Sequence, residues 1–262
     1  MSNKGDKLKI RVLGCSGGIA KGVATTSFLI DDDILIDAGT GVGELSLSEM
    51  KRIRYIFITH SHLDHVCSIA LLIDTLFEHL VGQPITVYAQ SSTIKVLKEN
   101  MFNWLLWPDF TALPKKSNAV LKFRAMGKGG IIDIDGRSIE MIEVNHSVPA
   151  VGYRIESQGK SFAFSGDTTT NDTFWAALNK HDNLDLLFVE AAFASKDADI
   201  AHLACHYCPQ TLAEDLPKLR HWPKVYISHL KPGDEKRIMR ECQKALPDWK
   251  LHQLKSGDRF KL

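Results

Sequence analysis

The sequence has few cysteines, and their positions do not form a framework. Its 262 residues include five, an odd number at scattered positions: Cys15, Cys67, Cys205, Cys208 and Cys242. This pattern excludes a disulfide scaffold and predicts free thiols in a reducing compartment, so we expect a cytoplasmic protein. Cys205 and Cys208 have the spacing of a redox or zinc pair. Because no second pair exists, we interpret that spacing as incidental.

Long apolar runs and an excess of charge of one sign are also missing. No stretch approaches the roughly 18 apolar residues of a membrane span, and Met1–Lys7 is polar, unlike a secretory signal. Lys and Arg total 32 against 31 Asp and Glu. The composition therefore predicts neither membrane association nor the broad basic surface of a nucleic-acid-binding protein, although a local basic patch stays open.

What the sequence does contain is an alternation of short apolar strands and amphipathic helices. We expect strands at residues 8–13, 26–30, 34–37, 55–59, 85–89, 131–134, 138–144, 153–157, 161–165, 184–190, 224–228 and 258–262. We expect helices at residues 66–80, 92–100, 209–219 and 234–245. The turns Asp135-Gly136 and Gln158-Gly159 predict hairpins. Together these elements predict a single α+β domain over residues 1–262, with two mixed but mainly antiparallel sheets and outer helices.

Two irregular segments offer weaker signals. Gly14-Cys15-Ser16-Gly17-Gly18 follows the first strand, and we interpret it as a tight turn rather than a phosphate cradle. The loop Met101–Asn118 carries Trp104, Trp107 and Phe110, which could stack on a base of a substrate. Packing of these aromatic side chains in the core or in a lid is the alternative.

Four potential metal ligands fall within six residues directly after an apolar strand. The segment is His60-Ser61-His62-Leu63-Asp64-His65, and zinc, manganese and iron accept imidazole and carboxylate ligands. His60 and His62 point the same way in an extended loop, whereas Asp64 and His65 turn aside as the next helix begins. Solvated loop histidines are the alternative. Burying so many ionisable groups without metal would be costly, however, so we favour a metal site.

Three further donors follow predicted strands in the second half of the chain. His146 comes after residues 138–144, Asp167 after 161–165 and His229 after 224–228. Each alone could be a loop, capping or surface residue. If the strands lie side by side, their ends converge, and the seven side chains predict a two-metal centre.

In this order the residues resemble the metallo-β-lactamase superfamily over nearly the whole chain. The matching positions are Asp37 in Ile36-Asp37-Ala38-Gly39, the histidine-rich run, His146, Asp167 and His229. The resemblance implies a four-layered αββα sandwich with the site at one edge of the sheets. It implies one metal held by His60, His62 and His146, another held by Asp64, His65 and His229, and Asp167 between them. Asp37 would orient the ligand loop. Two zinc ions are the expected cofactors, with manganese or iron as alternatives.

The motifs look like those of the phosphodiesterase branches. His146-Ser147-Val148-Pro149, and Glu190 with His206, resemble the ribonuclease Z group, in which a Glu–His pair relays a proton. The compact length and the lack of a Gly-rich basic insertion to hold tRNA are more similar to class II cyclic nucleotide phosphodiesterases. Ser68 departs from the family pattern, which often has glycine there.

The resemblance therefore implies hydrolysis of a small phosphodiester, with a 3′,5′-cyclic nucleotide giving a 5′-nucleotide as the first expectation. Two metals would activate a shared hydroxide, Asp64 would orient it, and Glu190 with His206 would protonate the leaving alkoxide. A structural role for the Glu190 and His206 pair is the alternative. An RNA-processing nuclease, a thioester hydrolase, a di-iron protein and a non-catalytic sensor stay open, as does a homodimer.

Overall fold

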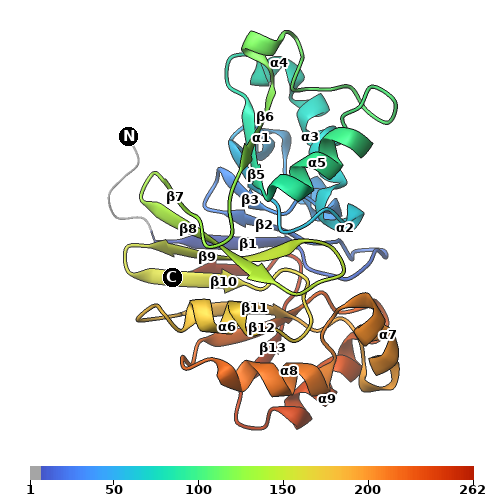
Figure 1. Cartoon of the computed structure of the whole chain (residues 1–262), viewed down its shortest axis with the longest axis vertical. Coiled ribbons are helices and arrows are strands. Elements are labelled where there is room, and N and C mark those ends of the chain that lie inside the picture. The colour runs from blue at the N-terminus through green and yellow to red at the C-terminus, as the bar shows by residue number, and fades with distance from the viewer. Residues whose placement is uncertain (1–6) are drawn as a thin grey trace.

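The computed structural model describes residues 7–262, and two seven-stranded sheets pack against each other in it (Figure 1). In spatial order, the first sheet consists of β14 (Arg259–Lys261), β1 (Lys9–Gly14), β2 (Ser27–Ile30), β3 (Ile34–Ile36), β4 (Tyr55–Phe57), β5 (Ile85–Ala89) and β6 (Leu121–Ala125). The second consists of β13 (Leu251–Gln253), β12 (Lys224–Ser228), β11 (Leu186–Glu190), β10 (Lys160–Phe164), β9 (Ala150–Ser157), β8 (Arg137–Val144) and β7 (Ile131–Ile134).

Helices cover the outer faces of the two sheets (Figure 1). Those of the first half are α1 (Leu47–Met50), α2 (Leu63–Val66), α3 (Ser68–Thr75), α4 (Phe77–Leu80) and α5 (Ser91–Asn100), with the 3₁₀ helices η1 (Thr40–Glu44) and η2 (Lys116–Asn118). Those of the second half are α6 (Thr173–Leu178), α7 (Ala198–Ala204), α8 (Pro209–Asp215) and α9 (Glu235–Ala245), with η3 (Ser195–Asp197) and η4 (Leu216–Lys218).

Three apolar layers hold these elements together. Ile34 and Ile36 of β3 face the layer between the sheets, where they join Phe188 of β11. Leu35, between them in sequence, belongs instead to the outer layer that contains Ile69 of α3. Because successive strand residues point to opposite faces, a strand buried on both sides reads as a continuous apolar run. A third layer joins the second sheet to α6, α8 and α9, so the predicted αββα sandwich is confirmed.

Each sheet is antiparallel in one half and parallel in the other. The first is antiparallel from β14 to β3 and parallel from β3 to β6, and the second is parallel from β13 to β10 and antiparallel from β10 to β7. The sheets are mixed, as predicted, but antiparallel pairings do not predominate, so the expectation of mainly antiparallel sheets is corrected to equal numbers of the two kinds of pairing. Hairpins at Asp135-Gly136 and Gln158-Gly159 join antiparallel neighbours, whereas helical crossovers such as α2–α4 join parallel ones.

Most expected elements are present, with two kinds of difference. The helix expected at residues 66–80 is divided, because Leu76 leaves helical geometry at φ −104° and ψ 8°. Several short elements were not predicted, among them α6, α7, β6 and β13, because three to seven residues carry too little periodicity. Within residues 7–262, no helix combines the length and apolar character needed to cross a membrane. The single domain stays a prediction.

A buried arginine joins the two sheets. Arg137, at the start of β8, has a side chain that is only 8% exposed. Its Nη1 and Nη2 donate to the two carboxylate oxygens of Asp33 at 2.5 and 2.9 Å, and Nη1 also donates to Asp31 at 3.2 Å. Both acids lie in the turn between β2 and β3, so one side chain connects the hairpin of the second sheet to the first.

Arg137→Ala should lower the free energy of unfolding by about 2 kcal/mol, because it leaves two partly buried carboxylates without their shared partner. Urea denaturation would measure the change. The matched control is Arg52→Ala, because Arg52 is 47% exposed and lies 3.7 Å from Asp32, a surface contact worth below about 1 kcal/mol. Equal effects of the two variants would contradict the structural role of Arg137.

Candidate metal centre

The structure brings all seven expected donor side chains together at one edge of the sandwich. They form two groups, within each of which the ligand atoms lie within 4.8 Å of one another. The first group is His60, His62 and His146, and the second is Asp64, His65, Asp167 and His229. Each donor follows or closely follows the carboxyl end of a strand, except for Asp64 and His65, which lie in α2. Convergence of strand ends therefore builds the cluster.

Asp167 belongs to the second group and also faces the first. Its Oδ2 is 3.7 Å from Nε2 of His60 and 3.2 Å from Nε2 of His65, and its Oδ1 is 3.2 Å from Nδ1 of His229. On the open side, Oδ2 of Asp64 is 3.7 Å from Nε2 of His65 and 3.9 Å from Nε2 of His229. A carboxylate in the position of Asp167 can contact metal ions held by the donors on either side of it.

Several buried atoms of the cluster have no hydrogen-bond partner of acceptable geometry. They are Nε2 of His60, Nε2 of His65, Nδ1 of His229 and Oδ1 of Asp167. Leaving one such buried group unsatisfied costs about 1–3 kcal/mol. Nitrogen and carboxylate oxygen donors that converge without partners are what zinc and similar cations bind, so the residues fit divalent metal ions.

Hydrogen bonds at Nδ1 fix the orientation of two histidine rings whose Nε2 atoms face the cluster. Asp37 Oδ2 accepts from Nδ1 of His65 at 2.7 Å, and because a carboxylate only accepts, Nδ1 of His65 carries the proton. His146 Nδ1 donates in the same way to the carbonyl of Cys205 at 2.9 Å. Nε2 of each ring then keeps its lone pair for a cation. The carbonyl of Cys205, rather than its thiol, therefore serves the site, and Cys205 adopts a left-handed conformation at φ 54°.

Thr59 is a residue that the sequence analysis missed. Its backbone N–H donates to Oδ1 of Asp37 and its hydroxyl to Oδ2, both at 2.8 Å. The same hydroxyl lies 3.0 Å from Nδ1 of His60 and, having given its proton to Asp37, can accept one there. Asp37 thus supports two donor histidines, one directly and one through Thr59. A hydroxyl next to a histidine run was the available signal.

Burial and neighbouring charges set the ionisation of the cluster. Burial lowers the pKa of His60 well below its usual range, which keeps its ring neutral. Burial would raise the pKa of Asp167, but the rings of His229 and His65 hold it well below its usual range. Burial would also lower the pKa of His65, but Asp167 and Asp37 raise it well above the usual value. The carboxylates of Asp37 and Asp167 thus stabilise a positive charge within the cluster, whether a proton on His65 or a bound cation supplies it.

The Glu190 and His206 side chains form a buried pair beside the cluster. Glu190 ends β11, and its Oε1 accepts from Nδ1 of His206 at 2.6 Å and from the backbone N–H of Thr168 at 2.8 Å. Burial would lower the pKa of His206, but the Glu190 carboxylate raises it to about 9. His206 also forms a third donor group with His146 and Asp167, and its ring stacks on His229 at 5.2 Å. The pair therefore presents a protonated ring to the centre.

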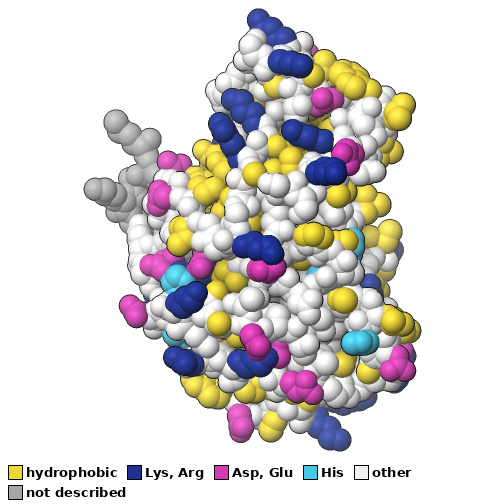
Figure 2. Space-filling model, viewed as in Figure 1, with side chains coloured by type: hydrophobic (Ala, Val, Ile, Leu, Met, Phe, Trp, Pro, Cys, Tyr) yellow, Lys and Arg dark blue, Asp and Glu magenta, His cyan; other side chains and the backbone are white. Residues whose placement is uncertain are grey.

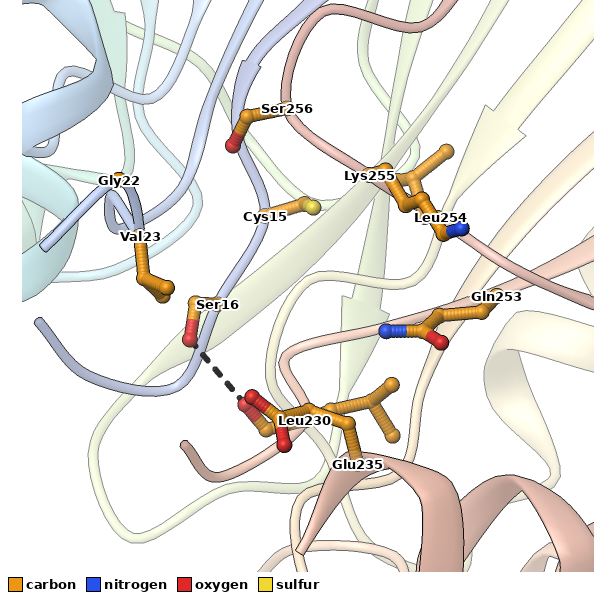
Figure 3. A pocket seen from close by; sticks show the side chains of 10 residues that line it. All are labelled: Cys15, Ser16, Gly22, Val23, Leu230, Glu235, Gln253, Leu254, Lys255 and Ser256. Carbon is orange, nitrogen blue, oxygen red and sulfur yellow. Dashed lines mark hydrogen bonds between the residues drawn. The ribbon is translucent and has the colours of Figure 1, made fainter. Parts of the chain in front are cut away.

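The glycine-rich segment after β1 supports His229, which lies at φ 58°. Cys15 accepts from the backbone N–H of His229 at 2.7 Å, and Ser16 Oγ donates to the carbonyl of Leu230 at 3.2 Å (Figure 3). A Cβ added to Gly17 would lie 2.6 Å from the carbonyl oxygen of His229 and 3.0 Å from its ring Cδ2. The interpretation as a mere tight turn was incomplete, because this contact joins residues 212 positions apart (229 − 17).

The aromatic side chains of the Met101–Asn118 loop do not act together. Phe110 is buried in the outer core of the first sheet, and Trp107 packs against that core. The expected contact of Phe110 with substrate is therefore corrected to core packing, the alternative given above, whereas contact of the partly buried Trp107 with substrate stays a prediction. Trp104 is 61% exposed, and its contact with substrate stays a prediction.

Comparison with known proteins identifies the family. The model of the β-lactamase superfamily domain matches residues 32–233, most of the chain. The chain belongs to the metallo-β-lactamase superfamily. Together with the clustered donors, this membership makes it a metal-dependent hydrolase.

Relatives within the superfamily carry two different names. A probable 3′,5′-cyclic-nucleotide phosphodiesterase of Yersinia pestis is 27% identical, over 86% of this chain and 78% of its own length. A ribonuclease Z of Prochlorococcus marinus is 23% identical, over 92% of this chain and 96% of its own. The crystal structure of unliganded yeast PDE1 superposes with a TM-score of 0.84 at 18% identity, covering 98% of this chain and all of that one, which shows the shared fold.

Asp167→Ala should lose most of the bound metal, because it removes the carboxylate that lies between the two donor groups. Elemental analysis of protein purified after metal loading would measure the loss. Asp172→Ala, which removes a carboxylate that is 87% exposed, is the matched control and should keep wild-type metal content. Two equivalents of metal in the Asp167 variant would refute the position given to this residue.

Gly17→Ala should weaken binding of one metal equivalent about 10- to 100-fold, because the new methyl group displaces His229 but not the first donor group. Competition with a chromophoric chelator would resolve the two equivalents. Gly43→Ala, whose Cβ would meet nothing within 4 Å, should bind both normally. Unchanged affinity for both equivalents in Gly17→Ala would show that the ring does not depend on this contact.

Proposed function

We propose that the chain is a phosphodiesterase that hydrolyses 3′,5′-cyclic nucleotides to 5′-nucleotides. The observation that supports the proposal is the convergence of two groups of buried and half-buried donors, with Asp167 of the second group facing His60 of the first and the Glu190 and His206 pair beside them. The relative from Yersinia pestis, similar over most of both chains, supports this substrate class. Phosphodiester hydrolysis is a reaction for which paired metal ions are well suited.

In this proposal His60, His62 and His146 would hold one metal ion, and Asp64, His65 and His229 would hold the other. Asp167 would be a ligand of both, and zinc fits the donors best because most of them are imidazoles. Bound divalent ions would lower the pKa of a water molecule and stabilise the negative charge of the reacting phosphate.

The remaining side chains orient groups and move a proton. His206, held protonated by Glu190, is placed to donate a proton to the leaving oxygen of the substrate. Asp64 has a side chain that is 34% exposed and faces both His65 and His229, so one of its oxygens can orient the attacking water. Asp37 and Thr59 hold the histidine loop in place.

A second candidate is an RNA-processing nuclease similar to ribonuclease Z. Lys and Arg side chains gather over β6 and α5 on the face shown in Figure 2. Exposed basic residues of these elements and the preceding loop are Lys95, Lys98, Lys115, Lys116, Lys122 and Arg124. Such a local basic patch can bind a nucleic-acid backbone, and the relative from Prochlorococcus marinus favours this candidate as well.

Incubation of zinc-, manganese- and iron-loaded protein with cyclic AMP and with precursor tRNA would test the proposal. We expect 5′-AMP from cyclic AMP, detected by chromatography. His206→Ala should lower kcat about 10²- to 10⁴-fold, because the leaving oxygen loses its proton donor. His202→Ala, on the exposed surface of α7, is the matched control and should behave as wild type. Cleavage of tRNA without turnover of cyclic AMP would overturn the proposal in favour of the nuclease.

A further inference from the structure

A cavity of about 340 Å³ adjoins the first donor group. His146 belongs both to its wall and to that group. The other walls come from the segment that joins β8 to β9, from Lys128 after β6, and from Gln90 after β5. A ligand with its reacting group at His60, His62 and His146 would therefore reach this cavity without leaving the protein surface.

Gln90 is placed in the cavity wall by the pairing of two parallel strands. Phe57 of β4 lies opposite Tyr88 of β5, so Gln90 follows β5 at the level of Thr59, next to His60. The side chain is 7% exposed, and its Nε2 has no hydrogen-bond partner. Oε1 accepts from Ser92 Oγ at 3.4 Å, which leaves the amide N–H groups for another acceptor. Gln90 precedes α5 without capping it, so helix formation does not explain the side chain.

The charges that line the cavity neutralise each other. Lys128 Nζ donates to the carboxylate of Glu143, and both residues border the cavity. Val144, Val148, Pro149 and Ala150 supply apolar wall. A paired cation and anion beside apolar side chains suit a neutral, partly polar group better than a second phosphate, which would leave its charge uncompensated.

We propose that this cavity is a subsite for the nucleobase of a nucleotide, in which Gln90 Nε2 donates a hydrogen bond to a ring nitrogen or carbonyl oxygen. The flat faces of a base fit beside Val148 and Pro149, and its polar edge supplies the acceptor that the Gln90 amide lacks, in a wall to which Asn145 and Ser147 add further polar groups. The inference rests on the proposed function, because it takes the first donor group as the position of the phosphate.

The test compares ligands with and without a base. Isothermal titration calorimetry of metal-loaded protein would measure Kd for adenosine 5′-monophosphate and for ribose 5-phosphate. We expect wild type to prefer adenosine 5′-monophosphate about 10-fold or more, and Gln90→Met to lose about 10-fold for that ligand alone. Gln83→Met, at an exposed glutamine, should keep the wild-type preference. Thermal unfolding would establish that each variant is folded.

Equal affinity of wild type for the two ligands, or a Gln90 variant that keeps the full preference, would overturn the subsite. A wrong assignment of the substrate in the proposed function would give a different result from a wrong assignment of the subsite. In that case cyclic AMP is not hydrolysed, although the preference for the ligand with a base and its dependence on Gln90 are both observed.

Discussion

The Asp37 carboxylate is the constraint on which the centre depends. It is fully buried at the end of β3, in a left-handed conformation at φ 56°, and receives hydrogen bonds from Thr59 and His65 on the neighbouring loop. Burial raises its pKa, and the hydrogen bonds from His65 and Thr59 oppose that rise. The cost of burying this group is offset only when the histidine loop adopts the conformation that gathers the donors. Folding of the histidine loop therefore also sets the positions of its donor side chains.

A hydrogen bond from Nδ1 of a histidine recurs around the cluster. His65, His146 and His206 each donate from Nδ1 to a carboxylate or carbonyl oxygen, and Nε2 is left toward the centre. Two of these rings are then suited to bind a cation, whereas the third, beside Glu190, is suited to carry a proton. His65 and His206 both have a carboxylate partner, so the place of each ring in the cluster, rather than the kind of partner, separates metal binding from proton transfer.

The sequence predicted which side chains converge, because their positions depend on local signals. His146, Asp167 and His229 each follow an apolar run, and a polar ligand type at a strand end is readable without knowing the fold. The parallel pairings were not readable, because crossovers such as the one through α6 contain helices too short to show a period. The role of Gly17 depends on contact with His229, far away in sequence, and that of Thr59 on contact with Asp37. Phe110 lies in an irregular segment, where no alternation marks a residue as buried.

The most direct test of the account is anomalous diffraction from crystals of the zinc-loaded protein at the zinc absorption edge. We expect two peaks about 3.5–4 Å apart, one among His60, His62 and His146 and the other among Asp64, His65 and His229, with Asp167 between them. A single peak, or zinc bound at Cys205 and Cys208 instead, would contradict it.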